Sequence, residues 1–159
     1  SAAGAAAGAR DYSEGAWASS FYKGTGLIGL GIVNKAEVYV ATKTSIEAAS
    51  GGKSTPAVTL PKGDELKAFF VCRPRGSFFY ETLGKDGKLT FHEYNVASKW
   101  VSKLELEDSA SAVALACVDK WVIRSTADGM GAVHIPSGNQ SQLRTFKDKS
   151  TEAIVSLSV

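Results

Sequence analysis

Three landmarks in the sequence recur at a spacing of 42 residues, and this repeat constrains the fold more than any other feature. The turn dipeptide Asp86-Gly87 recurs at Asp128-Gly129, His92 recurs at His134, and Leu104 is matched by Phe146. Around these landmarks, short apolar or alternating runs are separated by turn residues, which is typical of antiparallel strands. A period of this length predicts a chain built from copies of one supersecondary unit.

Each unit is predicted to hold four strands, so that the chain is all-β. The predicted strands are residues 27–33, 37–43, 45–49, 57–60, 67–72, 77–83, 88–94, 100–106, 112–118, 121–125, 131–135 and 143–146, and residues 153–159 open a further unit. The Asp-Gly pairs supply the positive φ of tight hairpin turns. All four prolines, Pro56 among them, fall at predicted strand ends or turns.

Residues 24–159 are predicted to form a single all-β repeat domain, and residues 1–23 differ from it in composition. Residues 1–10 are nearly all Ala and Gly, which predicts a flexible leader. Trp17 and Phe21 are four residues apart, which predicts a short helix with one aromatic face. Because the sequence shows neither a secretory core in its first ten residues nor an apolar run of membrane-spanning length, we expect a cytoplasmic protein with no membrane partner.

The order of features within the repeat resembles the WD-repeat family of β-propellers. In the last unit an Asp-Gly turn is followed by Pro136-Ser137-Gly138, by residues 143–146 and by the apolar run 153–157, and the unit before it shows the same order in residues 85–104. The resemblance covers residues 66–159 and is one of spacing, because Glu93-Tyr94 and Ile135-Pro136 stand where the family has Trp-Asp, and Gly-His is absent. It implies four-stranded blades and a non-catalytic scaffold for protein assembly.

A β-trefoil is the rival resemblance, since it also contains three four-stranded repeats and closes within a chain of this size. Residues 112–115 with 120–122 resemble the first hairpin of a unit in fascin-like and growth-factor-like families, and residues 100–104 resemble their fourth strand. This alternative implies a module that binds a glycan, actin or a receptor. A propeller needs at least about four blades to close, so a WD-like chain of three repeats implies a protein partner or a further subunit.

Charge and cysteine content give weaker constraints. Eighteen Lys and Arg against 16 Asp and Glu leave a net charge of +2, which gives no reason to expect a nucleic-acid partner. The apolar neighbours of Cys72 and Cys117 predict two free thiols in the core. The alternative is one disulfide between inner strands of adjacent units.

Candidate binding residues gather in the second repeat. Arg73, Arg75, Lys85 and Lys88 lie in or near predicted turns and are interleaved with aromatic residues such as Tyr80. A basic and aromatic patch of this kind suits an acidic peptide, a phosphate or a single-stranded nucleic acid. The alternative is that the aromatic rings point into the core and the charges are solvated.

His92 and His134 complete the candidate binding residues, since they occupy equivalent places in adjacent repeats. They are either a ligand pair or two copies of one structural position. Two histidines without further ligands do not support a zinc site. A hydrolase that uses His92 or His134 is a third alternative for the function, although no serine shows a nucleophile-elbow pattern.

Two glycine-rich motifs point to no cofactor. Residues 24–29 match G-x-G-x-x-G but lack the surrounding βαβ unit, so their glycines are expected to permit close strand packing or a bulge. Residues 52–55 end like a P-loop but lack its earlier glycine, and a surface loop is expected there. We therefore expect a protein-binding module without catalytic, cofactor or metal residues.

Overall fold

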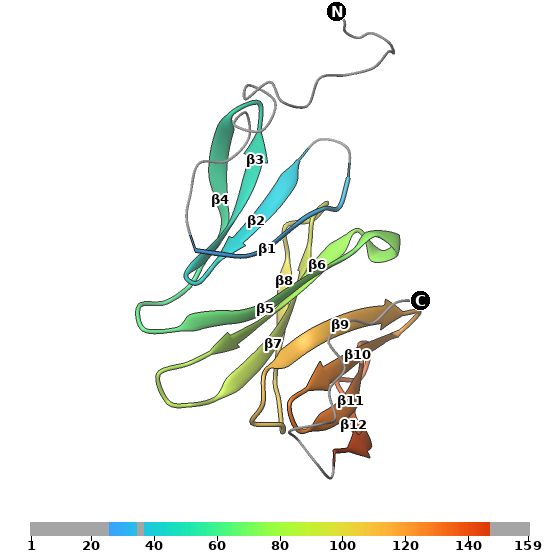
Figure 1. Cartoon of the computed structure of the whole chain (residues 1–159). Helices are drawn as coiled ribbons and strands as arrows, with labels where there is room; N and C mark the ends of the chain where they lie inside the picture. The colour runs from blue at the N-terminus through green and yellow to red at the C-terminus, as the bar shows by residue number, and fades with distance from the viewer. Residues whose placement is uncertain (1–25, 35–36, 147–159) are drawn as a thin grey trace, which may run out of the picture.

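The described chain consists of three four-stranded antiparallel sheets, in each of which every strand pairs with the next along the sequence (Figure 1). The computed structural model describes residues 26–34 and 37–146. Sheet 1 contains β1 (Leu27–Ile32), β2 (Val38–Thr42), β3 (Ser45–Ser50) and β4 (Lys53–Thr59); sheet 2 contains β5 (Glu65–Cys72), β6 (Ser77–Leu83), β7 (Leu89–Asn95) and β8 (Val101–Glu105); sheet 3 contains β9 (Ala112–Val118), β10 (Trp121–Thr126), β11 (Gly129–His134) and β12 (Gln140–Thr145). A short 3-10 helix, η1 (Arg73–Arg75), joins β5 to β6.

The prediction of an all-β chain of repeated four-stranded units is confirmed, and each of the first twelve predicted strands corresponds to an observed one. Pro56 is an exception to the predicted pattern, because it lies inside β4. It faces Glu47 at a bulge on the edge of sheet 1, where a missing N–H costs little. The predicted leader, the predicted aromatic helix and the predicted strand 153–159 lie outside the described residues.

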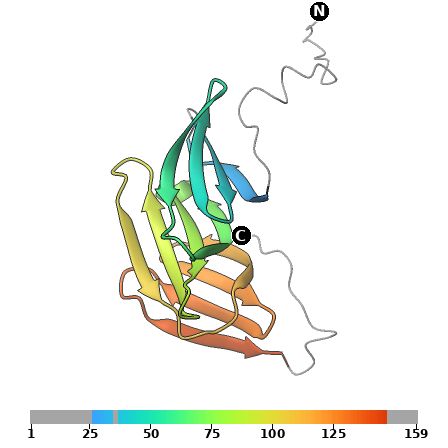
Figure 2. The same cartoon turned by 90° about the vertical axis from the view of Figure 1, so that its left-hand side faces the viewer.

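The three sheets follow one another along the molecule, with β5 lying against β1 on one side and against β9 on the other (Figure 2). Two glycines allow β1 to approach β5 closely: a Cβ atom at Gly29 would lie 3.2 Å from Phe69, and one at Gly31 would overlap the side chain of Val71. The expectation of close strand packing is confirmed at Gly29. Within the described strands the sheets form no closed barrel, and no helix among the described residues is long and apolar enough to cross a membrane.

Sheet 2 is buried on both faces because successive side chains of β6 point in opposite directions. Phe78 and Tyr80 join a core cluster with Tyr39 and Ile46 of sheet 1. Phe79 belongs to a second cluster, whose members from sheet 3 include Leu115, Val122 and Val133. Each pair of neighbouring sheets therefore has its own hydrophobic core.

Cys72 and Cys117 form a disulfide, so the prediction of two free thiols is wrong. Cys72 ends β5 and Cys117 lies near the end of β9, and their Cα atoms are 6.1 Å apart because these two strands lie side by side. The disulfide ties sheet 2 to sheet 3 across a sequence separation of 45 residues.

Candidate functional site

The predicted basic patch is split between the two ends of sheet 2. Arg73 and Arg75 lie on η1, before β6, whereas Lys85 and Lys88 lie in the hairpin that follows β6. A strand of this length separates its two ends by about 20 Å. Arg75 also forms a forked ion pair with Glu93, with N···O distances of 3.0 and 3.1 Å, which occupies its guanidinium group.

Tyr80 is a core residue and not part of a binding surface. Its side chain is 2% exposed and belongs to the cluster between sheets 1 and 2. Burial raises the pKa of Tyr80 to about 12, so the phenol is neutral at neutral pH. The alternative expectation, that the aromatic rings of this repeat point into the core, describes Tyr80 correctly.

His92 lies beside Tyr80 on the same face of sheet 2. The two rings stack with their centroids 4.4 Å apart, and His92 Nε2 is 2.9 Å from the Thr82 hydroxyl oxygen. The buried Nδ1 atom has no hydrogen-bond partner among the described residues. Burial, together with the positive charge of Lys103, lowers the pKa of His92 to about 4, so the imidazole is neutral at neutral pH.

His134 does not occupy the position in sheet 3 that His92 occupies in sheet 2. It pairs with Trp121 of β10, whereas the neighbouring Val122 points into the core between sheets 2 and 3. His134 and Trp121 therefore lie on the opposite face, which is turned away from sheet 2. Their rings are 4.7 Å apart, and His134 Nδ1 is 2.7 Å from the Ser137 hydroxyl.

The length of one hairpin explains this difference. Five residues separate the last paired positions Leu83 and Leu89 of β6 and β7, but four separate Ser125 and Met130 of β10 and β11. A change of one residue in the register moves a side chain to the other face of a sheet. The two histidines are therefore not brought together as a ligand pair.

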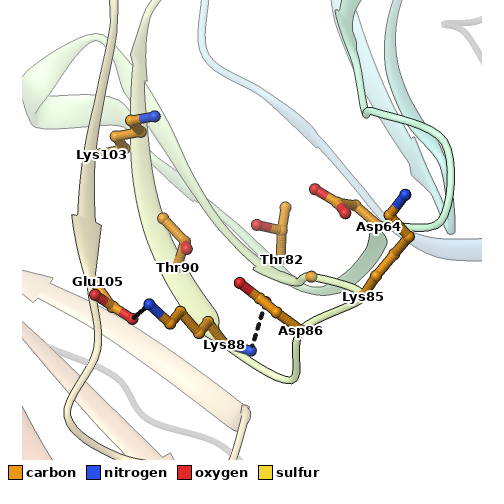
Figure 3. Close-up of a pocket in the computed structure, with 9 residues that line it drawn as sticks. Asp64, Thr82, Lys85, Asp86, Lys88, Thr90, Lys103 and Glu105 are labelled. Carbon is orange, nitrogen blue, oxygen red and sulfur yellow. Dashed lines mark hydrogen bonds and ion pairs between the residues drawn. The ribbon is translucent and has the colours of Figure 1, made fainter.

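Lys85 and Lys88 line a polar groove of about 530 Å³ (Figure 3), which we call the hairpin groove. Its walls come from the β4–β5 connection, the β6–β7 hairpin and the outer strands β7 and β8; its lining residues are Asp64, Thr82, Gly84, Lys85, Asp86, Lys88, Thr90, Lys103 and Glu105. Thr82, Thr90 and Glu105 are directly paired across β6, β7 and β8, so they share the face that is turned toward sheet 1.

Two of the three carboxylates of the hairpin groove are already engaged. Glu105 is 3.3 Å from the ammonium group of Lys88, and Asp86 accepts a hydrogen bond from the backbone N–H of Lys88 at 3.0 Å. Among the described residues, Lys85 and Lys103 form no ion pair within 4.0 Å. The groove therefore offers two ammonium groups and the carboxylate of Asp64 beside two threonine side chains.

Lys85 is held in place by the chain beneath it. Its aliphatic stem crosses Gly63 so closely that a Cβ atom there would lie 2.5 Å from Lys85 Cδ. Gly63 also has a φ of +94°, which disfavours any other residue. The stem is therefore packed while its ammonium group remains at the surface.

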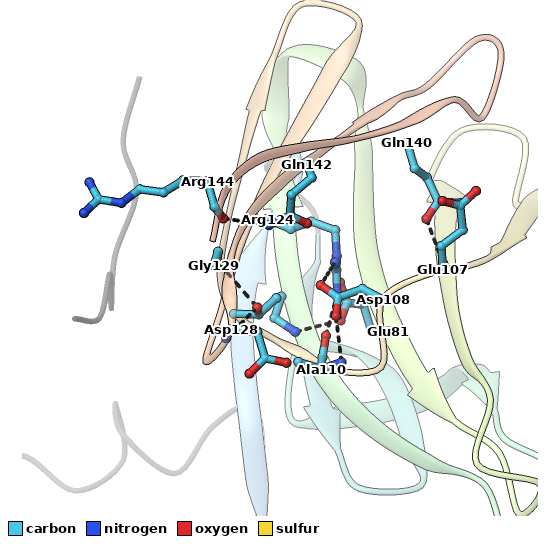
Figure 4. A network of polar contacts seen from close by, with 12 residues as sticks. Glu81, Glu107, Asp108, Ala110, Arg124, Asp128, Gly129, Gln140, Gln142 and Arg144 are labelled. Atoms are coloured by element: carbon cyan, nitrogen blue, oxygen red, sulfur yellow. Dashed lines mark hydrogen bonds and ion pairs between the residues drawn. The ribbon is translucent and has the colours of Figure 1, made fainter. Parts of the chain in front are cut away.

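A second polar constellation, which sequence reasoning missed, lies buried between sheets 2 and 3 (Figure 4). Arg124 donates two hydrogen bonds to Glu81, at 2.6 and 3.1 Å, and lies 3.4 Å from Asp108. Glu81 also accepts the backbone N–H of Ala112 at 2.8 Å, and Arg124 donates to the carbonyl of Ala110 at 3.1 Å. The sequence signal for Glu81 was its place directly after the aromatic run 78–80.

Metal chemistry has no support in the described part of the chain, where no three His, Cys, Asp or Glu side chains are grouped to hold an ion. His92 and His134 each contact a hydroxyl group, from Thr82 and Ser137 respectively. No carboxylate is hydrogen-bonded to either imidazole among these residues, so the geometry of a Ser-His-Asp triad is not assembled there.

The described arrangement of sheets occurs in known structures of very different sequence. The extracellular domain of a putative one-component system from B. thetaiotaomicron matches with a TM-score of 0.62 and 14% identity over 87% of this chain, and the computationally designed Ika4 protein matches with a TM-score of 0.56 and 15% identity over 87%. An oligogalacturonate lyase in complex with manganese matches with a TM-score of 0.59 and 9% identity over 72%. At such identities the likeness concerns the fold alone.

The matched proteins differ greatly from this chain in length. The chain spans 18% of the one-component system domain, 34% of the lyase and 82% of the designed protein. No protein-family model matches the sequence, and no curated protein matches it.

Proposed function

We propose that the three sheets are consecutive blades of a propeller-like scaffold. Each sheet has its strands in chain order, and the first strands of successive sheets, β1, β5 and β9, lie next to one another as innermost strands. A trefoil is less well supported, because the described strands form three separate sheets and close no barrel.

The function that we propose is non-catalytic binding of a protein partner in the hairpin groove. The observation that carries this proposal is the pair of ammonium groups, Lys85 and Lys103, that lie in a preformed groove without ion-pair partners among the described residues. Rigid strands hold the groove while its rim is a hairpin, which is a common arrangement for binding sites. A partner segment with a carboxylate for Lys103 and a polar group for Thr90 fits this chemistry.

The proposal is tested by weakening the groove without disturbing the core. A partner is first captured by crosslinking to the wild-type chain, and its affinity is then measured for the double variant Lys85→Ala/Lys103→Ala. Loss of two charge-assisted contacts predicts binding at least about tenfold weaker and a smaller dependence on salt. Lys120→Ala is the matched control, because Lys120 is also exposed but lies in the β9–β10 turn. Equal binding by the double variant and the control would overturn the proposal.

The disulfide also indicates the cellular compartment in which we propose that the chain works. Disulfides persist in oxidising environments and are rare in the cytosol, so the Cys72–Cys117 bond argues against the expected cytoplasmic location. We propose that the chain works in an oxidising compartment. Thiol labelling of the protein in cell extracts prepared under acid quench should find both cysteines blocked until a reductant is added.

A further inference from the structure

One face of sheet 3 is left without a neighbouring sheet. The face toward sheet 2 packs on it through Val122 and the ion pair of Arg124. The opposite face, which we call the open face, carries Trp121 and Ile123 of β10 and their paired residues Val118 and Ala116 of β9. Within the described residues, no strand of another sheet packs on it, and Trp121 and Val118 remain 38% and 39% exposed.

The chain itself supplies a segment that fits the open face. After Phe146, which follows the last strand of sheet 3, thirteen residues remain. Val155 and Leu157 lie 42 residues after Val113 and Leu115 of β9, so the repeat continues into this segment. We propose that residues 153–159 dock on the open face as the innermost strand of a fourth sheet, beside β9 as β9 lies beside β5.

The alternation of the segment agrees with this placement. Leu157 and Val159 alternate with Ser156 and Ser158. In a strand these two pairs point in opposite directions. The apolar pair therefore faces the apolar surface of sheet 3 and the serines point away from it.

The preceding interface predicts which residues meet. There, Cys72, the last residue of β5, is bonded to Cys117 of β9. Val118 is likewise the last residue of β9, and Val159 lies 42 residues after Cys117. The position of Val118 at the end of β9 therefore predicts that its side chain meets that of Val159, as Cys72 at the end of β5 meets Cys117.

Cysteine crosslinking tests the docking in the full chain. The variant Val118→Cys/Val159→Cys should form a second disulfide under mild oxidation, detected by mass spectrometry of proteolytic fragments. The control Val118→Cys/Ser158→Cys places the second thiol on the other side of the predicted strand and should crosslink at least tenfold more slowly. Equal crosslinking of the two variants, or none in either, would overturn the proposal.

Substitutions in the segment give a second measurement that does not depend on the added cysteines. Leu157→Asp places a charge against the open face and should lower the Tm by several degrees, whereas Ser158→Asp should leave it unchanged. An equal Tm for both variants counts against docking. The groove-binding experiment is independent, because its lysines lie on sheet 2, so either proposal can fail while the other stands.

Discussion

The two interfaces between neighbouring sheets are built from different chemistry. Between sheets 1 and 2 the contacts are aromatic: the ring of Tyr39 in sheet 1 lies 5.0 Å from that of Phe78 and 6.5 Å from that of Tyr94, both in sheet 2. Between sheets 2 and 3 the core is crossed by the Glu81–Arg124 ion pair and by a disulfide. The first interface therefore relies on packing, and the second adds a covalent and an ionic link.

One position accounts for much of the difference. Thr82 and Arg124 occupy corresponding places on β6 and β10, each two residues beyond a side chain that faces the preceding sheet. Arg124 extends into the space between sheets 2 and 3, where a cavity of about 190 Å³ remains, whereas the short Thr82 lines the hairpin groove of about 530 Å³. Within one repeat architecture, the longer side chain links two sheets through an ion pair and the shorter one leaves a larger groove.

The largest effect is expected from removing the buried partner of Arg124. Glu81→Ala leaves the Arg124 guanidinium with the partly exposed Asp108 at 3.4 Å as its remaining ion-pair partner, and breaking a buried ion pair on one side costs about 3–5 kcal/mol of the free energy of unfolding. Urea denaturation followed by circular dichroism measures this loss.

The matched control replaces both charges at once. Glu81→Leu/Arg124→Met fills a similar volume without a charge, so its stability should lie within about 1 kcal/mol of wild type or above it. If the double variant is as unstable as Glu81→Ala, the ion pair itself, and not the desolvated charge left behind, holds the two sheets together.

The disulfide gives the next largest effect, and it should be confined to the second interface. Cys72→Ala/Cys117→Ala removes a crosslink that closes a long loop, which predicts a loss of about 2–4 kcal/mol. Hydrogen exchange should quicken in β9 to β12 more than in β1 to β4. Reduction of the wild-type chain should reproduce the result, and uniform acceleration across all three sheets would contradict a local role.

Most of the strands could be predicted from the sequence, because short apolar or alternating runs bounded by turn residues mark them. The strand β4 was only partly predicted, because it begins at Lys53, inside the surface loop expected for residues 52–55. Contacts between sheets could not be predicted in the same way. Glu81 and Arg124 are 43 residues apart, and each looks like an ordinary solvated charge until the two sheets are placed together. The pairing of Cys72 with Cys117 likewise depends on which strands are innermost.

The candidate site could be predicted only in part. Lys85 and Lys88 do line a groove, because hairpin residues stay at the surface. Lys103 was missed, since nothing in the sequence shows that β8 brings it to the same groove. The equivalence of His92 and His134 failed because it assumed equal hairpin lengths, and a difference of one residue is enough to reverse a face.

The smallest effect is a pH dependence that belongs to the first interface. The pKa of His92 is about 4 in the folded chain against an ordinary value of 6.5, so between these values the unfolded chain binds a proton that the folded chain excludes. The free energy of unfolding should therefore fall as the pH drops from 7 to 4.5. The loss should be smaller than the complete exclusion of one proton would give, because His92 is partly exposed to solvent. His92→Gln should flatten this part of the stability profile in urea titrations at several pH values. His134→Gln, which alters the open face of sheet 3, is the control. If the free energy of unfolding of both variants depends on pH as in the wild type, the acid sensitivity does not originate at His92 between sheets 1 and 2.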